Sequence, residues 1–276
     1  MSLFKAGPGP LALPLRILPF GLGSRRALLL VERNIYIYRS GWLVIFSGFF
    51  EPLFYLLSVG LGIGGMIGDI PGPGGTPIPY ALFVAPALLA SASMNGAIAE
   101  STFNVFFKLN YQKTYDAVLA TPLGPGDVAL GEIMWAVIRS TLYALGFVIV
   151  IGVLGLIASP WVVLAVPAAA LLAFAFAAVG MAATTFMRSW QDFDLVQLVV
   201  LPLFLFSGTF YPVSSYPEPL QVVVMLTPLW HGVDLIRALV TGAVDVGILW
   251  HIAYLAILGL VGLAVVARRL DKLLLK

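Results

Sequence analysis

The amino-acid sequence predicts an all-α membrane protein with six transmembrane helices. Hydrophobic residues make up 61% of the 276 residues and charged residues 10%, whereas a soluble domain is typically about half apolar and about one quarter charged. The mean hydropathy is +1.01. A helix needs roughly 20 apolar residues to cross a bilayer. Six segments approach that length: 41–67, 79–101, 132–157, 161–186, 194–211 and 247–267.

The composition also excludes several classes of function. A net charge of +2 is too small to indicate a nucleic-acid partner. The sequence contains no cysteine, which rules out disulfides, thiolate metal sites and cysteine nucleophiles. The two histidines, His231 and His251, do not have the spacing of a metal-binding pair, so no metal site is predicted.

The chain begins with two segments of different character. Residues 1–23 are rich in Gly and Pro, with Arg16 among the apolar residues, so we expect an irregular cytoplasmic N-terminus rather than a cleavable signal. In residues 24–40, Arg25, Glu32 and Arg39 recur every seven residues. This pattern predicts a helix lying in the membrane interface. The alternative is a juxtamembrane extension of the first span.

Between the second and third spans the sequence predicts a short amphipathic helix at the water surface. Apolar and aromatic residues recur at i, i+4, i+7 and i+8 from Tyr111 to Leu119, and Thr121-Pro122 with the following Gly-Pro-Gly ends the helix. Such a helix is suited to docking a partner protein, although a plain connecting loop is the alternative. The residues assigned to docking are Tyr111, Lys113, Tyr115, Asp116 and Leu119.

The long passage between the fifth and sixth spans predicts two short re-entrant helices. Prolines interrupt residues 207–219 too often for a continuation of the fifth span, and residues 220–226 are apolar but too short to cross a membrane. Thr227 and Pro228 have the character of an N-cap and a first helical residue, and Gly242 is suited to end the helix. Helices at this depth are tolerated where protein covers them.

Lys and Arg are distributed unequally about the six predicted spans, which predicts the orientation. Only Arg237 falls on the external side. Both termini and the loop 108–132 are therefore predicted to be cytoplasmic. The basic residues on that side are Lys5, Arg16, Arg25, Arg26, Arg33, Arg39, Lys108, Lys113, Arg139, Arg188, Arg268, Arg269, Lys272 and Lys276.

Four sequence pieces in order carry a resemblance to a known family. They are Glu51-Pro-Leu-Phe-Tyr-Leu-Leu57 with Gly60-x-Gly62; Ala120-Thr-Pro-Leu123 with Gly131-Glu132; Ser207-Gly-Thr-Phe-Tyr-Pro212; and Thr227-Pro-Leu-Trp-His231 with Asp234, Arg237, Ala238 and Gly242. With these pieces the chain resembles the membrane subunits of type-2 ABC exporters, in the branch of the lipo-oligosaccharide (nodulation-factor) and anthracycline-resistance permeases. The resemblance covers nearly the whole chain after residue 24.

The resemblance implies an interfacial helix over 24–40, a six-span permease domain over 41–268 and a cytoplasmic tail over 269–276. It also implies two ATPase subunits that bind ATP and magnesium, a second permease chain, identical or paralogous, and contact with lipids of a prokaryotic cytoplasmic membrane. This chain has no glycine-rich phosphate-binding loop, because the glycines needed upstream of Lys113-Thr114 are absent. We therefore expect no cofactor on this chain and ATP hydrolysis on another polypeptide.

Two groups of residues are candidates for function within the permease. Glu51, near the middle of the first span, with Tyr55 and Asn95, is assigned to a translocation path or subunit seam, because an ionisable group there costs a few kcal/mol unless paired or hydrated. The alternative is a structural hydrogen bond near Pro52, and for Glu100 a structural role is favoured. An external gate is assigned to Phe210, Tyr211, Leu229, Trp230 and His231, with headgroup anchoring as the alternative.

Three functions are compatible with this pattern, and they differ in what they require. An exporter of an amphiphile, meaning a lipid, glycolipid or hydrophobic drug, needs a coupling element and a path through the spans. An intramembrane lipid-modifying transferase needs clustered acids, His or Ser at one membrane face, whereas the 13 acids are scattered. An ion-coupled carrier needs several charged residues inside the spans, and Glu51 is the clearest of these. The sequence therefore favours the exporter.

Overall fold

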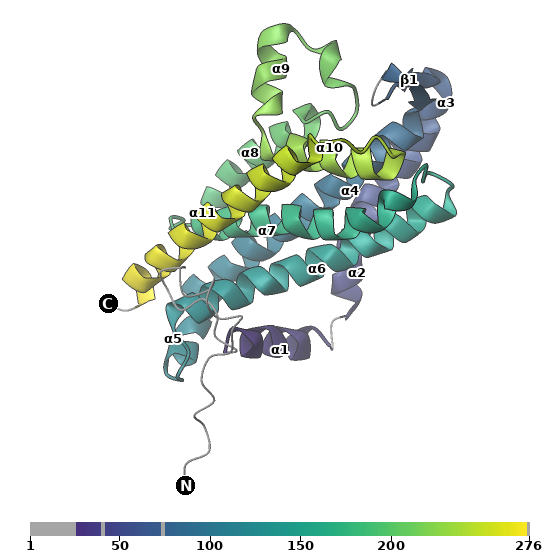
Figure 1. Ribbon diagram of the computed structural model, residues 1–276. Coiled ribbons are helices and arrows are strands. Elements are labelled where there is room, and N and C mark those ends of the chain that lie inside the picture. The colour runs from purple at the N-terminus through teal and green to yellow at the C-terminus, as the bar shows by residue number, and fades with distance from the viewer. Residues whose placement is uncertain (1–25, 40–41, 73–74, 275–276) are drawn as a thin grey trace.

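The computed structural model describes residues 26–39, 42–72 and 75–274, and the expectations for residues 1–25 lie outside these ranges. Long helices form a tilted bundle, and α1 crosses one end of it as a separate helix (Figure 1). In order, the elements are α1 (Ala27–Tyr38), α2 (Trp42–Tyr55), η3 (Leu56–Ile63), α3 (Gly64–Ile67), β1 (Asp69–Pro71), β2 (Pro77–Pro79), α4 (Tyr80–Ala99), η5 (Glu100–Asn104), η6 (Phe107–Tyr111), α5 (Thr114–Leu119), α6 (Pro125–Val153), η7 (Pro160–Leu164), α7 (Ala165–Thr184), α8 (Asp192–Phe206), η8 (Val213–Ser215), α9 (Glu218–Met225), α10 (Pro228–Thr241) and α11 (Ile248–Leu274).

The all-α membrane fold is confirmed, with differences at the predicted boundaries. Within the described residues, five helical segments are long and apolar enough to cross a membrane: Phe50–Ile67, Tyr80–Tyr111, Pro125–Val153, Pro160–Thr184 and Ile248–Leu274. The second span continues ten residues beyond its predicted end, and the third begins seven residues earlier than predicted. The polar residues at these ends, of which Thr102 and Glu132 are buried and Asn104 and Lys108 half-buried, do not interrupt the helices.

The fifth predicted span, 194–211, is too long. Its helix, α8, has 15 residues and ends at Phe206, because Ser207 leaves the helix and Gly208 takes φ of 71°. At 1.5 Å per residue it measures about 22 Å, which is short for a bilayer crossing. After it, α9 and α10 are bent by 84° at their junction, the geometry of a broken span or a re-entrant loop.

A small β-hairpin joins the first two spans and was not predicted from the sequence. Strand β1 pairs antiparallel with β2, with Ile70 opposite Ile78. Pro71 pairs with Pro77 at the end of the hairpin, where a missing N–H is tolerated.

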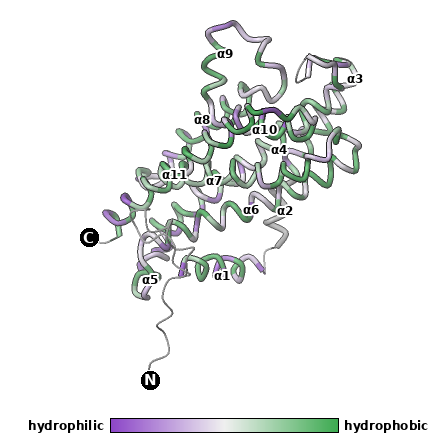
Figure 2. Tube along the Cα trace, in the orientation of Figure 1, coloured by the Kyte–Doolittle hydropathy of each residue, from purple (hydrophilic) through white to green (hydrophobic). Residues whose placement is uncertain are grey.

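Hydrophilic residues gather at the ends of the bundle (Figure 2). One end carries α1, α5 and the last turns of α11, and the other carries the hairpin and α9 (Figure 1). We call the first the basic end, because it holds Arg26, Arg33, Lys113, Arg188 and Arg268. Arg26 Nη1 donates to the carbonyl oxygen of Pro122 over 2.6 Å, which fixes the start of α1 to the turn before α6.

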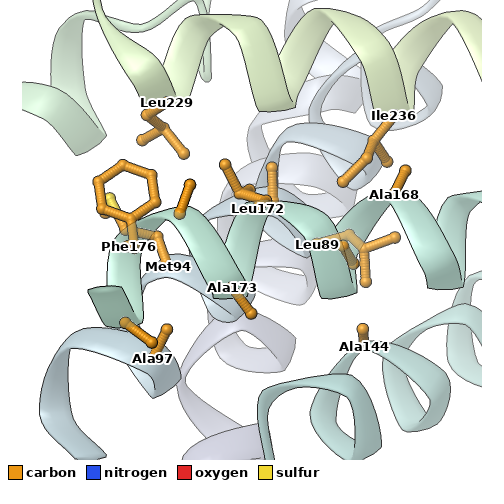
Figure 3. Packing of buried hydrophobic residues seen from close by; sticks show 14 of the residues in the cluster. Leu89, Met94, Ala97, Ala144, Ala168, Leu172, Ala173, Phe176, Leu229 and Ile236 are labelled. Atoms are coloured by element: carbon orange, nitrogen blue, oxygen red, sulfur yellow. The ribbon is translucent and has the colours of Figure 1, made fainter. Parts of the chain in front are cut away.

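The core is built around α4 and α7. Leu89, Met94 and Ala97 of α4 meet Leu172 and Phe176 of α7 (Figure 3). Small residues bring α11 close to α7: a Cβ on Gly262 would lie 2.9 Å from the backbone carbonyl carbon of Ala178. Close backbone approach through glycine and alanine is how helices gain packing energy inside a membrane.

Two segments are left largely uncovered by the rest of the chain. All of α8 lies in the described part of the chain, and none of its side chains is buried. The first span is likewise the least buried of the five long apolar segments. The uncovered side of the bundle is therefore the side where α2, η3 and α8 lie.

Candidate transport cavity and its polar anchors

An open cavity of about 710 Å³ lies between α2, α4 with η5, α6 and α8. It is lined by Glu51, Tyr55 and Asn95, so the structure brings together all three residues assigned to a path or seam. Along α8 the lining runs from Phe193 in the first turn to Phe204 in the last. The lining combines amide and carboxylate groups with aromatic rings, which suits an amphiphilic ligand.

Glu51 faces this cavity rather than the helix core. Its side chain is exposed on α2, and within the described residues it has no ion-pair or hydrogen-bond partner. The structural alternative, a hydrogen bond that fixes the helix near Pro52, is therefore not observed in this part of the chain. A carboxylate in this position is available to a ligand or to a partner chain.

Aromatic residues bound the cavity at its end farther from the basic end. The rings of Tyr55 and Phe204 lie 5.4 Å apart, those of Phe204 and Phe210 5.2 Å, and those of Tyr55 and Phe210 6.4 Å. Phe210 is one of the predicted gate residues, and its partners come from α2 and α8. Rings at these separations attract one another in edge-to-face arrangements.

The other predicted gate residues, Tyr211, Leu229, Trp230 and His231, do not join this cluster. Leu229 is fully buried against α7 (Figure 3), because α10 is amphipathic and packs its apolar face on the core. Tyr211 instead packs against Tyr216, with the ring centroids 5.1 Å apart and the rings tilted by 56°. Trp230 lies 5.0 Å from His231 and 5.3 Å from the ring of His251.

The polar and charged residues of α10 make contacts to other elements. His251 Nε2 of α11 lies 3.2 Å from Asp234 Oδ2, and the Nδ1 atoms of His231 and His251 are 2.8 Å apart. Arg237 is buried and donates to the carbonyl oxygens of Gly208 at 2.6 Å and Phe83 at 3.3 Å. These side chains therefore connect α10 to α11, to the segment after α8 and to α4.

At the basic end, the buried carboxylate of Glu100 is the centre of a network. It forms a salt bridge with Arg139 and accepts hydrogen bonds from Trp135 Nε1 at 2.9 Å and Asn104 Nδ2 at 2.8 Å. Tyr38 Oη of α1 donates to it over 3.4 Å. The favoured structural role for Glu100 agrees with these contacts and with its burial, since only 2% of it is exposed.

A second buried carboxylate, Glu132, was missed as a site residue. Its Oε2 accepts from Lys108 Nζ at 2.8 Å and from Asn34 Nδ2 at 3.2 Å. Gly131, beside it, lets α1 approach α6 closely, since a Cβ there would lie 2.9 Å from the carbonyl oxygen of Ala27. The available signal was an acid at the first residue of the predicted third span, with a lysine seven residues after the predicted end of the second.

The predicted docking residues divide between buried and exposed positions. Tyr115 is 1% exposed and packs in the core, so its assignment to an external groove is wrong. Tyr111 belongs to η6, where it stacks on Phe107 at 5.2 Å. Leu119 is half-buried, whereas Lys113 and Asp116 are exposed.

The reason for this division is a break between η6 and α5. Lys113 takes a left-handed backbone conformation, with φ of 48°. The predicted row of apolar and aromatic residues from Tyr111 to Leu119 therefore does not lie on one face of one helix. Burial raises the pKa of the Tyr115 hydroxyl well above its usual value, and the nearby Glu132 carboxylate raises it further. The hydroxyl is therefore neutral, as expected of a group inside the fold.

The described residues contain no group of three or more His, Cys, Asp or Glu side chains placed to hold a metal ion. The arrangement is instead that of a multi-pass helical bundle with an open amphiphilic cavity and charged anchors at one end. This defines a membrane transport protein by class.

Comparison with known proteins identifies the family. Residues 25–241 match the family described as ABC-2 type transporter. The chain therefore belongs to the ABC-2 type transporter family and is a membrane permease.

Individual relatives agree with this membership. Nodulation protein J of Rhizobium leguminosarum bv. trifolii is 33% identical over 239 residues, covering 85% of this chain and 88% of the relative. Nodulation protein J of Rhizobium meliloti (strain 1021) is 33% identical over 208 residues, covering 74% and 77%. The inner membrane transport permease YhhJ of Escherichia coli (strain K12) is 30% identical over 141 residues, covering 50% of this chain and 37% of the relative.

Proposed function

We propose that this permease is the membrane subunit of an ATP-driven exporter that moves an amphiphile, a lipid, glycolipid or hydrophobic drug, out of the cytoplasm. The observation that carries the proposal is the cavity shared by Glu51, Tyr55 and Asn95. It offers polar groups beside aromatic rings on the side of the bundle that the chain leaves uncovered. An amphiphile can enter such a site from the membrane with its apolar part still in a nonpolar environment.

Energy would come from two ATPase subunits, each binding ATP with magnesium. The full sequence lacks the glycine-rich loop that cradles phosphates, and the family to which the chain belongs supports ATPase partners. On this chain, the docking surface would consist of the exposed residues of α5 and its ends: Gln112, Lys113, Asp116, Ala117 and Ala120.

The motion of α5 would reach the bundle through the buried anchors at the basic end. Tyr115 holds α5 to the core, and Glu132 joins α6 to Lys108 and to Asn34 of α1. Since these contacts are buried and charged, displacing η6 or α1 independently of α6 would separate the Glu132 carboxylate from its partners at a large cost. These three elements would therefore move together, with α5 attached to the core through Tyr115, and this motion would give alternating access to the cavity.

A second permease chain, identical or paralogous, would cover the uncovered faces of α2 and α8. Leu198 and Leu201 of α8 and Phe54 of α2 are more than half exposed, and apolar faces of this kind pack against lipid or another membrane helix. By the distribution of Lys and Arg, the basic end and both termini face the cytoplasm of a prokaryotic cell, in its inner membrane.

Copurification tests this proposal. The tagged chain is extracted in mild detergent from membranes of its source cells, and the retained proteins are identified by mass. We expect an ATPase subunit and a permease in stoichiometric amounts, and ATP hydrolysis by the purified assembly. Recovery of the chain without an ATPase, from membranes in which it is folded and abundant, would contradict the proposal.

A further inference from the structure

The charges that line the cavity do not balance. The acidic lining residues are Glu51, Glu100 and Asp194, and among the described lining residues Arg139 is the one basic side chain. Arg139 is already paired with Glu100. The carboxylates of Glu51 and Asp194 have no ion-pair partner within the described residues, so the lining carries two uncompensated negative charges.

The position of Glu51 makes this imbalance costly in the empty cavity. Glu51 lies in the first span, in the part of the cavity shared with Tyr55 and Phe204. An ionised carboxylate on a membrane-spanning helix costs free energy unless a positive group or water stabilises it. A cationic group of a ligand would remove this cost, whereas an anionic group would increase it.

Aromatic rings line the same cavity close to Asp194. The ring centroids of Phe103 and Trp190 lie 5.5 Å apart, those of Trp190 and Phe193 5.4 Å, and those of Phe103 and Phe193 5.6 Å. Half of Trp190 and 44% of Phe103 remain exposed. Exposed ring faces attract cations, and several rings around one position are how quaternary ammonium groups are recognised.

We propose that this cavity selects amphiphiles whose head group carries a positive charge, with Glu51 and Asp194 as counter-ions and Phe103, Trp190 and Phe193 as the aromatic surface. This inference rests on the proposed function, because it names the substrate class of the same cavity. It also excludes a class: anionic amphiphiles meet two carboxylates and no unpaired basic group among the described lining residues. The ring cluster joins η5 and η6 to the start of α8, so these rings and Asp194 line the part of the cavity nearer the basic end, whereas Glu51 lines the part shared with Tyr55 and Phe204.

A pair of probes of opposite charge tests the selection directly. Tetraphenylphosphonium is a lipophilic cation, and tetraphenylborate is an anion of the same shape. Binding of each is titrated to the full chain reconstituted in lipid nanodiscs, and the partition into empty nanodiscs is subtracted. We expect saturable binding of the cation and none of the anion. Equal saturable binding of both, or saturable binding of the anion alone, would overturn the proposal.

Variants assign the binding to this cavity. Glu51→Gln keeps the side-chain shape and is expected to weaken cation binding about tenfold, and Trp190→Leu is expected to weaken it as well. Asp69→Asn, which removes an exposed carboxylate from the β-hairpin at the opposite end, serves as the matched control with unchanged binding. Unaltered cation binding by a folded Glu51→Gln variant would overturn the assignment.

The binding measurement needs neither ATP nor a partner chain, so its failure is distinguishable from failure of the proposed function. Cation binding without an associated ATPase would leave the selection intact and contradict the exporter. ATP-driven export of an anionic amphiphile by the assembly, with no cation binding, would support the exporter and contradict the selection of cations.

Discussion

Lys108 Nζ donates to Glu132 Oε2 over 2.8 Å, and both side chains are almost completely covered, with 11% and 1% of their surfaces exposed. The pair joins the end of the second span to the beginning of the third. Asn34 completes it from α1 by donating to the same oxygen. The Glu132 carboxylate of α6 therefore binds α1 through Asn34 and η6 through Lys108. This site lies next to α5, the helix proposed to dock the ATPase.

Breaking this pair from one side should destabilise the permease. Lys108→Met leaves the buried Glu132 carboxylate with Asn34 as its remaining donor, and loss of one partner of a buried ion pair typically costs about 3–5 kcal/mol. We expect a lower midpoint of thermal unfolding in detergent. Lys272→Met, at an exposed lysine of α11, is the control and should leave the midpoint unchanged.

The double variant separates charge from packing. Adding Glu132→Leu to Lys108→Met removes the unpaired carboxylate and should recover much of the lost stability, because an apolar replacement of a buried pair is often neutral. If the losses of stability in Lys108→Met and in Glu132→Leu simply add in the double variant, the two side chains do not act as a pair.

Tyr115 and Asp116 are neighbours with opposite expected effects. Tyr115→Ala empties a core position and should lower the free energy of unfolding by about 3 kcal/mol or more, as for other large-to-small core changes. Asp116→Arg changes an exposed charge on α5 and should leave folding intact while reducing ATP hydrolysis and ATPase retention in the copurified assembly. A Tyr115→Ala variant with wild-type stability would contradict the core position, and an Asp116→Arg variant with normal coupling would contradict the docking surface.

The sequence was sufficient for the membrane class, the helical bundle and the grouping of Glu51, Tyr55 and Asn95. These follow from hydropathy and from one ionisable residue inside a span, signals that depend on local composition. The sequence also indicated the start and end of α10, because Thr227, Pro228 and Gly242 are local start and stop signals.

Contacts between distant segments could not be read in this way. A stripe from Tyr111 to Leu119 assumes one continuous helix, whereas the left-handed Lys113 rotates α5 and buries Tyr115. Leu229 and Phe210 are equally apolar in sequence, and only the packing of α10 on α7 shows that Leu229 is core. Likewise, Glu100 is bound by Trp135 and Arg139 of α6 and by Tyr38 of α1, and the periodicity of one helix does not reveal such partners. The partners of Glu132, Lys108 of η6 and Asn34 of α1, are equally distant in sequence.

Close packing of α1 on α6 depends on Gly131. A Cβ at this position would lie 2.8 Å from Leu30 Cβ and 2.9 Å from the carbonyl oxygen of Ala27, and neither α1 atom moves without the helix. Gly131→Ala should therefore displace α1, lower thermal stability and reduce coupling to the ATPase. Gly65→Ala is the matched control, since nothing lies within 4 Å of a Cβ there. Equal midpoints for the two variants would contradict the close contact.

Arg237 fixes the segment after α8 to the bundle. Arg237→Met would leave the carbonyl oxygens of Gly208 and Phe83 without this donor and would lose the stacking on Phe83, whose ring centroid lies 3.8 Å away. Each lost hydrogen bond to a charged group is worth about 1.5–3 kcal/mol, so we expect faster hydrogen exchange across residues 207–210. Arg268→Met, at an exposed arginine of α11, should leave that exchange unchanged. Unchanged exchange in Arg237→Met would show that other contacts hold the segment.

The most direct test of the account is the accessibility of the cavity during the ATP cycle. The chain has no native cysteine, so Gln197→Cys places a single thiol in the cavity lining, and Leu260→Cys on the uncovered face of α11 is the control. A membrane-impermeant thiol reagent is applied to each side of vesicles holding the assembly, with and without ATP trapped by vanadate. We predict that Gln197→Cys reacts from the cytoplasmic side without nucleotide and from the opposite side in the trapped state, while Leu260→Cys reacts in neither. Labelling of Gln197→Cys from the same side in both states would contradict alternating access through this cavity.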